Sequence, residues 1–285
     1  MRSAILPVVL MLSACAPSVT SADGPDADGG AGSRCTQTAA ALHCAHHTLV
    51  VSPGGLGLGS RGVHWQVPLG APPAKGWPVV LMFQGSFFSA DTFWDSTPSA
   101  PYGGWSQANV VRALLDRGFA VITPKTRFDG AYYWDTNVIG QSDNWSASDD
   151  HHLMLAIFDG IATGRFGTLD TTRWYATGIS SGGYMTSRMA LSYPGKFRAL
   201  AVVAASWATC AGALCTIPAT LPADHPPTLF LHGEKDPTVP VSTMRSYAAA
   251  LTAQRMELRV VTDADAGHAW LDVAPAEVSG WFAAH

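Results

Sequence analysis

Strand-like and helical segments alternate along the chain from about residue 46 to its end. Trp77–Phe83 (WPVVLMF) is a continuous apolar run, typical of a strand buried on both faces of a sheet. The other expected strands are His47–Ser52, Val63–Val67, Phe119–Thr123, Arg173–Ile179, Ala199–Ala205, Thr228–His232 and Leu258–Thr262. The expected helices are Trp105–Asp116, Asp149–Ala162, Gly182–Tyr193, Ser242–Ala253 and Pro275–Ala284. This alternation predicts an α/β fold, with a mostly parallel twisted sheet and helices on both faces.

A short segment rich in glycine and serine, Gly178–Gly182 (GISSG), joins a predicted strand directly to a predicted helix. In this context the pattern G-x-S-x-G is typical of a nucleophile elbow, a tight turn that raises a serine side chain above the sheet. Glycines allow the strand and the helix to approach, while the serine itself has a strained backbone. We therefore expect Ser180 to be a nucleophile at the carboxyl edge of the sheet. A purely structural turn is the alternative.

A nucleophilic serine needs a histidine base. His268 lies in a loop of small residues, Ala266–Trp270, directly after the last predicted strand, where an imidazole can reach over the sheet edge. His225 lies in a proline-rich loop and His232 closes a strand. We therefore expect His268 to be the base, with a structural histidine as the alternative.

The base in turn needs an acid that orients it. Asp236 follows a predicted strand and precedes a predicted helix, which makes it the expected acid. Three other carboxylates are possible, namely Glu234, Asp263 and Asp265. The order serine, acid, histidine along the chain is that of the α/β-hydrolase fold, which we expect this chain to adopt.

Two backbone N–H groups are expected to bind the oxyanion of the reaction. One belongs to Ser181, the residue after the nucleophile. The other is expected in the loop Gln84–Phe88, where Gly85 lets the backbone turn inward and the N–H of Ser86, or less favourably of Phe87, is then available.

Aromatic side chains are expected to form an apolar substrate cleft around the nucleophile. Tyr184 follows the elbow, and the other candidates follow predicted strands or lie in loops: Phe87, Phe88, Trp94, Trp134 and Trp207. Some of these residues are expected to be ordinary core aromatics. Charged residues make up 13% of the chain, about half the usual ~25%, which suits a protein that works at an apolar partner.

The chain has a formal net charge of −4 and no run of Lys or Arg, so no nucleic-acid partner is predicted. It has no phosphate-binding loop or dinucleotide fingerprint, and its adjacent histidine pairs do not have metal-ligand spacing. The sequence therefore predicts neither a cofactor nor a metal.

The N-terminus has the pattern of an export signal, since Arg2 precedes an apolar stretch, Ala4–Leu12, that is too short to span a bilayer. Leu12–Cys15 (LSAC) looks like a bacterial lipobox, which implies residues 1–15 as signal peptide and lipidation of Cys15. Ordinary cleavage after Ala16 is the alternative. Residues 16–34 are expected to be a flexible linker, because they have almost no apolar side chains, and residues 35–285 the catalytic domain.

Four cysteines remain for an exported protein, which favours disulfides over a metal site. Three connectivities are possible. We expect the local one, Cys35–Cys44 and Cys210–Cys215, because the members of each pair are close in the sequence.

The elbow and its helix, Gly178–Ala190 (GISSGGYMTSRMA), closely resemble the extracellular medium-chain-length poly(3-hydroxyalkanoate) depolymerases of the poly(3-hydroxyoctanoate) type. Leu231–Pro240 and the His268 loop also resemble that family, and more distantly the chain is similar to short-chain depolymerases and feruloyl esterases. The resemblance covers most of the chain from about residue 35, and no polymer-binding domain is appended.

The resemblance implies hydrolysis of ester bonds in a hydrophobic polyester by Ser180, Asp236 and His268. It also implies that the catalytic domain itself adsorbs to the polymer. The lipobox departs from a freely secreted enzyme, so the protein is expected to be exported either as an extracellular enzyme or as a cell-surface, outer-membrane lipoprotein. Three alternatives remain: an esterase of soluble esters of the general or feruloyl type, a serine peptidase, and an inactive binding protein on the same scaffold.

Overall fold

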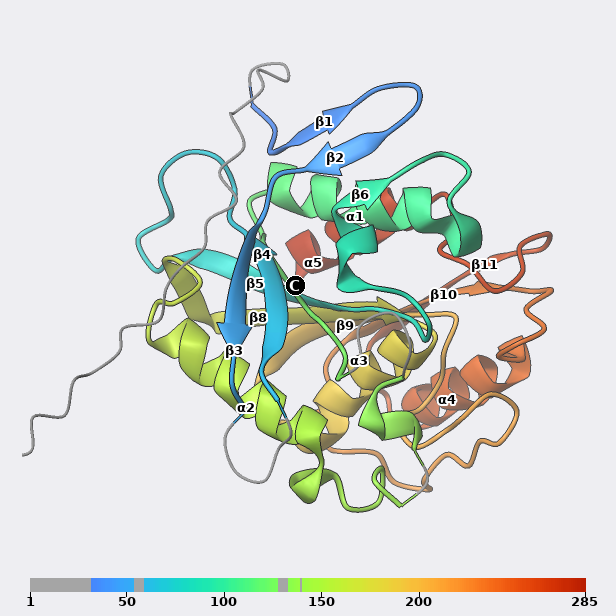
Figure 1. Ribbon diagram of the computed structural model, residues 1–285. Coiled ribbons are helices and arrows are strands. Elements are labelled where there is room, and N and C mark those ends of the chain that lie inside the picture. Colours follow the sequence, from blue (N-terminus) through green and yellow to red (C-terminus); the bar gives the residue numbers. More distant parts are fainter. Residues whose placement is uncertain (1–31, 54–58, 128–132, 139) are drawn as a thin grey trace, which may run out of the picture.

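The computed structural model describes residues 32–53, 59–127, 133–138 and 140–285. An eight-stranded sheet runs through its centre, in the order β11-β10-β9-β8-β5-β7-β4-β3 (Figure 1). The strands are β3 (His47–Val51), β4 (Arg61–Gln66), β5 (Trp77–Phe83), β7 (Ala120–Pro124), β8 (Leu169–Ile179), β9 (Phe197–Val203), β10 (Thr228–Gly233) and β11 (Leu258–Asp263). Neighbouring strands are parallel from β11 to β7, whereas β4 is antiparallel to both of its neighbours.

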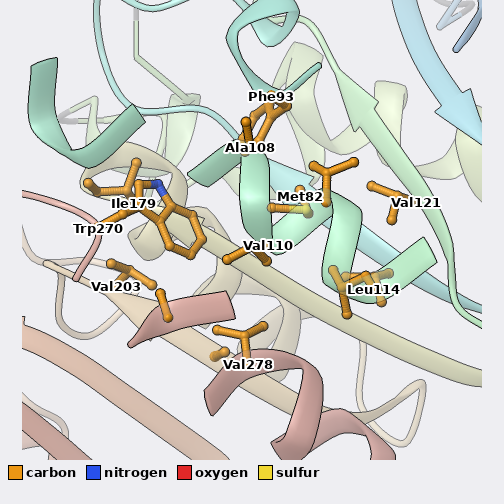
Figure 2. Packing of buried hydrophobic residues seen from close by; sticks show 14 of the residues in the cluster. Met82, Phe93, Ala108, Val110, Leu114, Val121, Ile179, Val203, Trp270 and Val278 are labelled. Atoms are coloured by element: carbon orange, nitrogen blue, oxygen red, sulfur yellow. The ribbon is translucent and has the colours of Figure 1, made fainter. Parts of the chain in front are cut away.

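Helices cover both faces of this sheet. The α-helices are α1 (Gly104–Asp116), α2 (Asp149–Ala162), α3 (Ser181–Ser192), α4 (Val241–Ala253) and α5 (Ala274–Ala284). Short 3₁₀ helices span Ala90–Phe93, Pro101–Gly103, Asp135–Asn137 and Trp145–Ala147. One face is covered by α1 and α5, whose side chains pack with those of β5 and β9, as Figure 2 shows for Val110, Leu114 and Val278. The other face carries α2, α3 and α4.

Strand β5 shows why its sequence is continuously apolar. Successive side chains of a strand point to opposite faces of the sheet. Val80 and Met82 accordingly pack beneath α1 and α5, while Val79, Leu81 and Phe83 pack against α2 and α3. All five side chains are fully buried, so both faces of the strand need apolar residues.

The predicted α/β fold is therefore confirmed, and the expected strands and helices are present with ends that differ by up to four residues. The largest difference is at β8, which begins at Leu169 rather than Arg173. A second, three-stranded sheet was not predicted. It consists of β1 (Cys35–Gln37), β2 (Leu42–Cys44) and β6 (Asp95–Ser96), and all of its pairings are antiparallel.

Both predicted disulfides are present. Cys35 and Cys44 join β1 to β2, and Cys210 and Cys215 close a short loop after β9. The predicted signal peptide, with Cys15, and nearly all of the predicted linker lie outside the described residues. Within the described ranges, no helix has the length and the apolar character needed to cross a membrane.

Candidate active site

Ser180 lies at the sharp turn between β8 and α3. Its backbone has φ 57° and ψ −123°, a region that residues with a side chain rarely adopt. The surrounding structure holds this conformation in place: Ser180 N donates to Val203 O of β9 at 3.0 Å, and Tyr184 N donates to Ser180 O at 3.0 Å. A strained serine at the carboxyl end of a central strand is the geometry of a nucleophile elbow.

The glycines of the elbow are required by close backbone contact. A Cβ atom on Gly182 would lie 2.0 Å from Phe83 O, and one on Gly178 would lie 2.5 Å from Gly182 O. Strand β5, strand β8 and helix α3 therefore approach one another at a point where no side chain fits. This approach fixes the position of Ser180 above the sheet.

His268 and Asp236 are hydrogen-bonded to each other. His268 Nδ1 lies 2.7 Å from Asp236 Oδ2, although 32 residues separate the two in the sequence. The other carboxylate oxygen, Oδ1, accepts hydrogen bonds from Thr238 N and Val239 N, each at 2.8 Å. The loop after β10 thus fixes the carboxylate, and the carboxylate fixes the imidazole in the tautomer with its proton on Nδ1.

A second imidazole, that of His232, faces the same carboxylate. His232 Nε2 lies 3.3 Å from Asp236 Oδ2 and 2.9 Å from Val239 O, and the side chain is fully buried. Burial raises the pKa of Asp236, but hydrogen bonds from His232, His268 and Val239 N outweigh this effect and hold it well below its ordinary value. The sequence pattern places His232 only at the end of a strand. Its spacing of four residues before Asp236 was the available signal.

Ser180 and His268 both line a cavity of about 1040 Å³. Both residues are described, and no hydrogen bond joins the Ser180 hydroxyl to the imidazole in this structure. Such contacts between nucleophile and base are often long without substrate. None of the three rival carboxylates, Glu234, Asp263 and Asp265, contacts His268: they bind Arg245, backbone N–H groups and Lys235, respectively.

The loop expected to supply an oxyanion donor lies directly beside Ser180. A Cβ atom on Gly85 would lie 3.7 Å from Ser180 Cβ, and Ser86 lines the cavity. Phe87 has a positive φ of 65°, so the loop is strained next to the nucleophile. Ser181 is the first residue of α3, and its N–H has no acceptor within the helix because the first four N–H groups of a helix lack one.

The side chain of Ser181 anchors another segment. Its hydroxyl accepts a hydrogen bond from Trp134 N at 2.9 Å and donates one to Asn137 Oδ1 at 2.8 Å. Trp134 Nε1 in turn donates to Gln84 O at 2.9 Å, which supports the loop expected to bind the oxyanion. Neither role was predicted, because no sequence pattern links residues 134–137 to the elbow.

Two of the six expected substrate-contact residues, Phe87 and Phe88, line the cavity. Two further aromatic residues join them there, Tyr102 and Tyr133. The rings meet edge to face: Phe87 with Tyr133 at 6.2 Å between centroids, Phe88 with Tyr102 at 5.3 Å, and Tyr102 with His268 at 6.2 Å.

The other four expected contacts are corrected, because their side chains are at most 3% exposed and do not line the cavity: Trp94, Trp134, Tyr184 and Trp207. Each fills the core beside a strand end. Trp94 Nε1 donates to Thr123 Oγ1 at 2.8 Å, and the hydroxyl of Tyr184 accepts from Gly212 N at 3.1 Å. The sequence does not separate core from cleft here, because large aromatic side chains occur in both.

Tyr102 was not predicted as part of the site. It has a positive φ of 56°, and its carbonyl accepts a hydrogen bond from Trp270 N at 3.0 Å, two residues after His268. Gly103 fits tightly here, since a Cβ atom would lie 2.2 Å from Trp270 O. This contact fixes the Tyr102 ring against the imidazole. Within the described ranges, no group of three His, Cys, Asp or Glu side chains has an arrangement that holds a metal ion.

A strained serine at an elbow and a histidine–aspartate pair on neighbouring loops of an α/β sheet define the class of serine hydrolases with the α/β-hydrolase fold. The chain is 49% identical over 228 residues to the poly(3-hydroxyoctanoate) depolymerase of Pseudomonas fluorescens, covering 80% of this chain and 81% of that protein. The chain belongs to this depolymerase family, as the elbow sequence predicted, and is a serine hydrolase that acts on ester bonds.

Other comparisons agree with this fold. The prolyl oligopeptidase family matches residues 216–280, which include Asp236 and His268. An acetyl xylan esterase from Aspergillus awamori superposes with a TM-score of 0.59 at 17% identity, over 84% of this chain and 99% of that one. A thermophilic esterase from Thermogutta terrifontis gives a TM-score of 0.56 at 16% identity, over 83% of this chain and 90% of that one. These two structures show the shared α/β-hydrolase fold.

Proposed function

We propose that this protein hydrolyses the ester bonds of hydrophobic polyesters, the medium-chain-length polyhydroxyalkanoates, through an acyl-enzyme on Ser180. One observation carries the proposal: Ser180 and the Asp236-bound His268 open into a large cavity rimmed by aromatic side chains. A soluble short ester needs no such rim. The name of the Pseudomonas fluorescens relative supports the same substrate class.

In the proposed reaction, Ser180 Oγ attacks the ester carbonyl carbon while its proton passes to His268 Nε2. The resulting oxyanion is bound by the N–H groups of Ser181 and Ser86. The alcohol end of the cleaved chain leaves with the proton from His268, and the acyl group stays on Ser180. Water then gives its proton to His268 and attacks the acyl carbon, which releases the acid and restores Ser180. Asp236 stabilises the imidazolium in both halves of the cycle.

The proposal is tested by clearing of a medium-chain-length polyhydroxyalkanoate latex. The wild-type protein is expected to clear it, and the Ser180→Ala variant to lose at least about 10⁴-fold in rate. Retained far-UV circular dichroism shows that the variant is folded. Full activity of Ser180→Ala would contradict the assignment of the nucleophile, and absence of clearing by the wild type would contradict the polyester substrate.

A soluble-ester function is the second candidate, because two of the proteins with the same fold are named esterases. It predicts rapid turnover of short soluble esters without clearing of the latex. The match to the prolyl oligopeptidase family raises a peptidase function as well, which turnover of a chromogenic peptide would detect. A protein that bound the latex and turned over neither kind of substrate would be a binding protein on this scaffold.

We also propose that the protein is exported and anchored by a lipid on Cys15. The two disulfides fit an oxidising compartment. Mass spectrometry of the mature N-terminus is the test: a diacylated Cys15 supports the anchor, and a free N-terminus beyond residue 15 contradicts it. A Cys15→Ser variant is then expected to leave the membrane fraction.

A further inference from the structure

The cavity extends well beyond the reacting groups. From Ser180 and His268 it reaches the small sheet, where its wall is formed by Leu42 and His43 of β2, by Asp95 and Ser96 of β6 and by the turn residue Ala41. Its volume of about 1040 Å³ lies at the upper end of the range for pockets that enclose a whole small ligand. The ester group being cleaved, together with the carbon atoms bonded to it, leaves most of this volume unfilled.

The distant wall is held firmly in place. The Cys35–Cys44 disulfide joins β1 to β2, and β2 pairs with β6. Cys44 N donates to Trp94 O at 2.7 Å, and Leu42 is 1% exposed within the core beneath α1. Figure 1 shows β1, β2 and β6 beside α1, at the side of the molecule away from α4. The wall is thus a fixed surface to which substrate binds without the cost of ordering a loop.

The chemistry of the wall matches a polyester chain, which alternates alkyl side chains with ester carbonyls. Ala100 and Pro101 supply apolar surface, and the hydroxyl groups of Ser96, Thr97 and Ser99 supply hydrogen-bond donors. The carboxylate of Asp95 is paired with His43, whose Nδ1 lies 2.5 Å from Asp95 Oδ1. This contact engages one oxygen of the carboxylate, and the hydroxyl donors beside it suit an uncharged, acceptor-rich chain.

We propose that the β2–β6 wall of the cavity is a subsite for a repeat unit of the polyester next to the one being cleaved, and that it makes the enzyme prefer oligomers to single esters. This inference rests on the proposed polyester function. It assigns a substrate-binding role to the small N-terminal sheet, which no sequence pattern linked to a function.

Two alanines of one turn provide the test. Ala41 is exposed and lines the cavity, whereas Ala39, two residues earlier in the same turn, is exposed and does not. The turn closes through the hydrogen bond from Thr38 N to Ala41 O, which uses backbone atoms of Ala41 and survives substitution. Ala41→Trp fills the distant end of the cavity, and Ala39→Trp is the matched control. Thr97→Trp, at the residue directly after β6 in the same wall, is an independent second variant.

Wild type and variants are compared on p-nitrophenyl butyrate and on linear oligomers of 3-hydroxyoctanoate of increasing length. Wild-type kcat/KM is expected to rise from dimer to longer oligomers. Ala41→Trp is expected to reduce this rise by about tenfold, which corresponds to about 1.4 kcal/mol of binding. Turnover of p-nitrophenyl butyrate is expected to stay unchanged, which also shows that the variant is folded, and Ala39→Trp is expected to behave as wild type.

The outcomes separate the two proposals. If the wild type cleaves longer oligomers better and neither Ala41→Trp nor Thr97→Trp changes this preference, the subsite is wrong while the polyester function stands. If the wild type shows no preference for oligomers and does not clear the latex, the proposed function itself fails. If both Ala39→Trp and Ala41→Trp reduce the preference equally, the effect comes from the turn and the subsite is contradicted.

Discussion

At the scale of single residues, the Asp236 carboxylate is the most densely bonded group of the site. Two backbone N–H groups bind Oδ1, and the imidazoles of His268 and His232 both face Oδ2. Because these contacts lower its pKa below the ordinary 3.8, the folded state gains stability from Asp236 at pH values above 3.8. That gain is lost as the pH falls below 3.8 toward the lowered pKa. The acid thus contributes to stability as well as to the proposed catalysis.

His232 is expected to act as a positioning residue for Asp236. His232→Leu removes one hydrogen bond to a charged group, which contributes about 1.5–3 kcal/mol, so we expect kcat/KM for a soluble ester to fall about 10- to 100-fold. His232→Gln, which keeps an N–H donor, is expected to restore part of the activity. The pKa of Asp236 is expected to move back toward 3.8 in His232→Leu. The fall in Tm when the pH is lowered from about 7 to about 3 is therefore expected to be smaller in this variant than in wild type.

Thermal unfolding followed by circular dichroism measures this change across the pH range. A variant that lost Tm equally at every pH would show that His232 only fills space. Equal activity of His232→Leu and His232→Gln would lead to the same conclusion, since only one of them carries the donor.

The sequence could place the three residues of the proposed triad near one another because each follows a strand in the order that the fold requires. Ser180 and His268 accordingly line one cavity, and Asp236 is hydrogen-bonded to His268. Tyr102 could not be predicted, because its position depends on a backbone contact with Trp270, which is 168 residues away. The four buried aromatic residues were misassigned for a related reason, since a segment near a strand end can direct its side chains either into the core or into the cleft.

At the scale of elements, the site depends on how closely α3 approaches β5. Gly182→Ala would place a Cβ atom 2.0 Å from Phe83 O, so the helix must move away. We expect this variant to lose at least about 3 kcal/mol in the free energy of unfolding and nearly all esterase activity. Gly280→Ala in α5 is the matched control, because nothing lies within 4 Å of its Cβ position.

Gly280→Ala is expected to be neutral or to stabilise the protein by about 0.5–1 kcal/mol, since alanine is the better helix former. Urea unfolding of both variants measures the two changes. Similar stabilities for Gly182→Ala and wild type would mean that the elbow tolerates displacement of α3, which contradicts the close approach of α3 to β5.

A buried pair of carboxylates joins two other elements, the loop at 133–138 and the start of α2. Asp135 N donates to Asp150 Oδ2 at 2.6 Å, and Asp150 N donates to Asp135 Oδ2 at 3.1 Å. Burial, followed by repulsion from Asp150, raises the pKa of Asp135 to about 6. Because the pKa of Asp135 is higher in the folded state, its contribution to stability is fully present at pH values below 3.8. This contribution is lost as the pH rises through about 6.

Asp135→Asn removes the ionisation and with it this pH dependence. We therefore expect the Tm of Asp135→Asn relative to wild type to increase as the pH is raised from about 4 to about 7. Differential scanning calorimetry at several pH values measures the difference. A constant difference, or one that decreases with pH, would mean that Asp135 is ionised throughout this range.

The small sheet shows the limit of prediction at this scale. Its strands have only two or three residues, too few for a period-two pattern to stand out. Its position depends on β6, which is more than fifty residues from β2 and pairs with it only in the folded chain. The disulfide prediction was correct and marked the place, but it did not indicate that a sheet forms there.

At the scale of the whole molecule, few charges and a local cluster of exposed aromatic residues act together. Charged residues are 13% of the chain. Among the described residues, the exposed large aromatic side chains are Phe87, Tyr102 and Tyr133, and all three line the cavity that contains Ser180. An apolar polymer therefore meets its most favourable contacts at the entrance to the proposed active site.

Adsorption to the latex is accordingly expected to be insensitive to salt. At about 1 M salt the Debye length falls to about 3 Å, which screens contacts between charges and leaves apolar burial intact. The inactive Ser180→Ala variant is incubated with polyhydroxyalkanoate latex at low salt and at about 1 M sodium chloride, and the unbound protein is measured after centrifugation. Phe87→Ser in the same background is expected to weaken adsorption, because the Phe87 side chain is 69% exposed at the cavity mouth.

Leu214→Ser provides the matched control, since Leu214 is 76% exposed and does not line the cavity. It removes a similar apolar side chain at a distance from the proposed contact, so adsorption is expected to remain at the Ser180→Ala level. Release of the protein by salt would indicate that charges dominate the contact. Equal losses for Phe87→Ser and Leu214→Ser would indicate that the polymer is bound over the general surface, and that the aromatic residues at the cavity mouth have no special part in delivering ester bonds to Ser180.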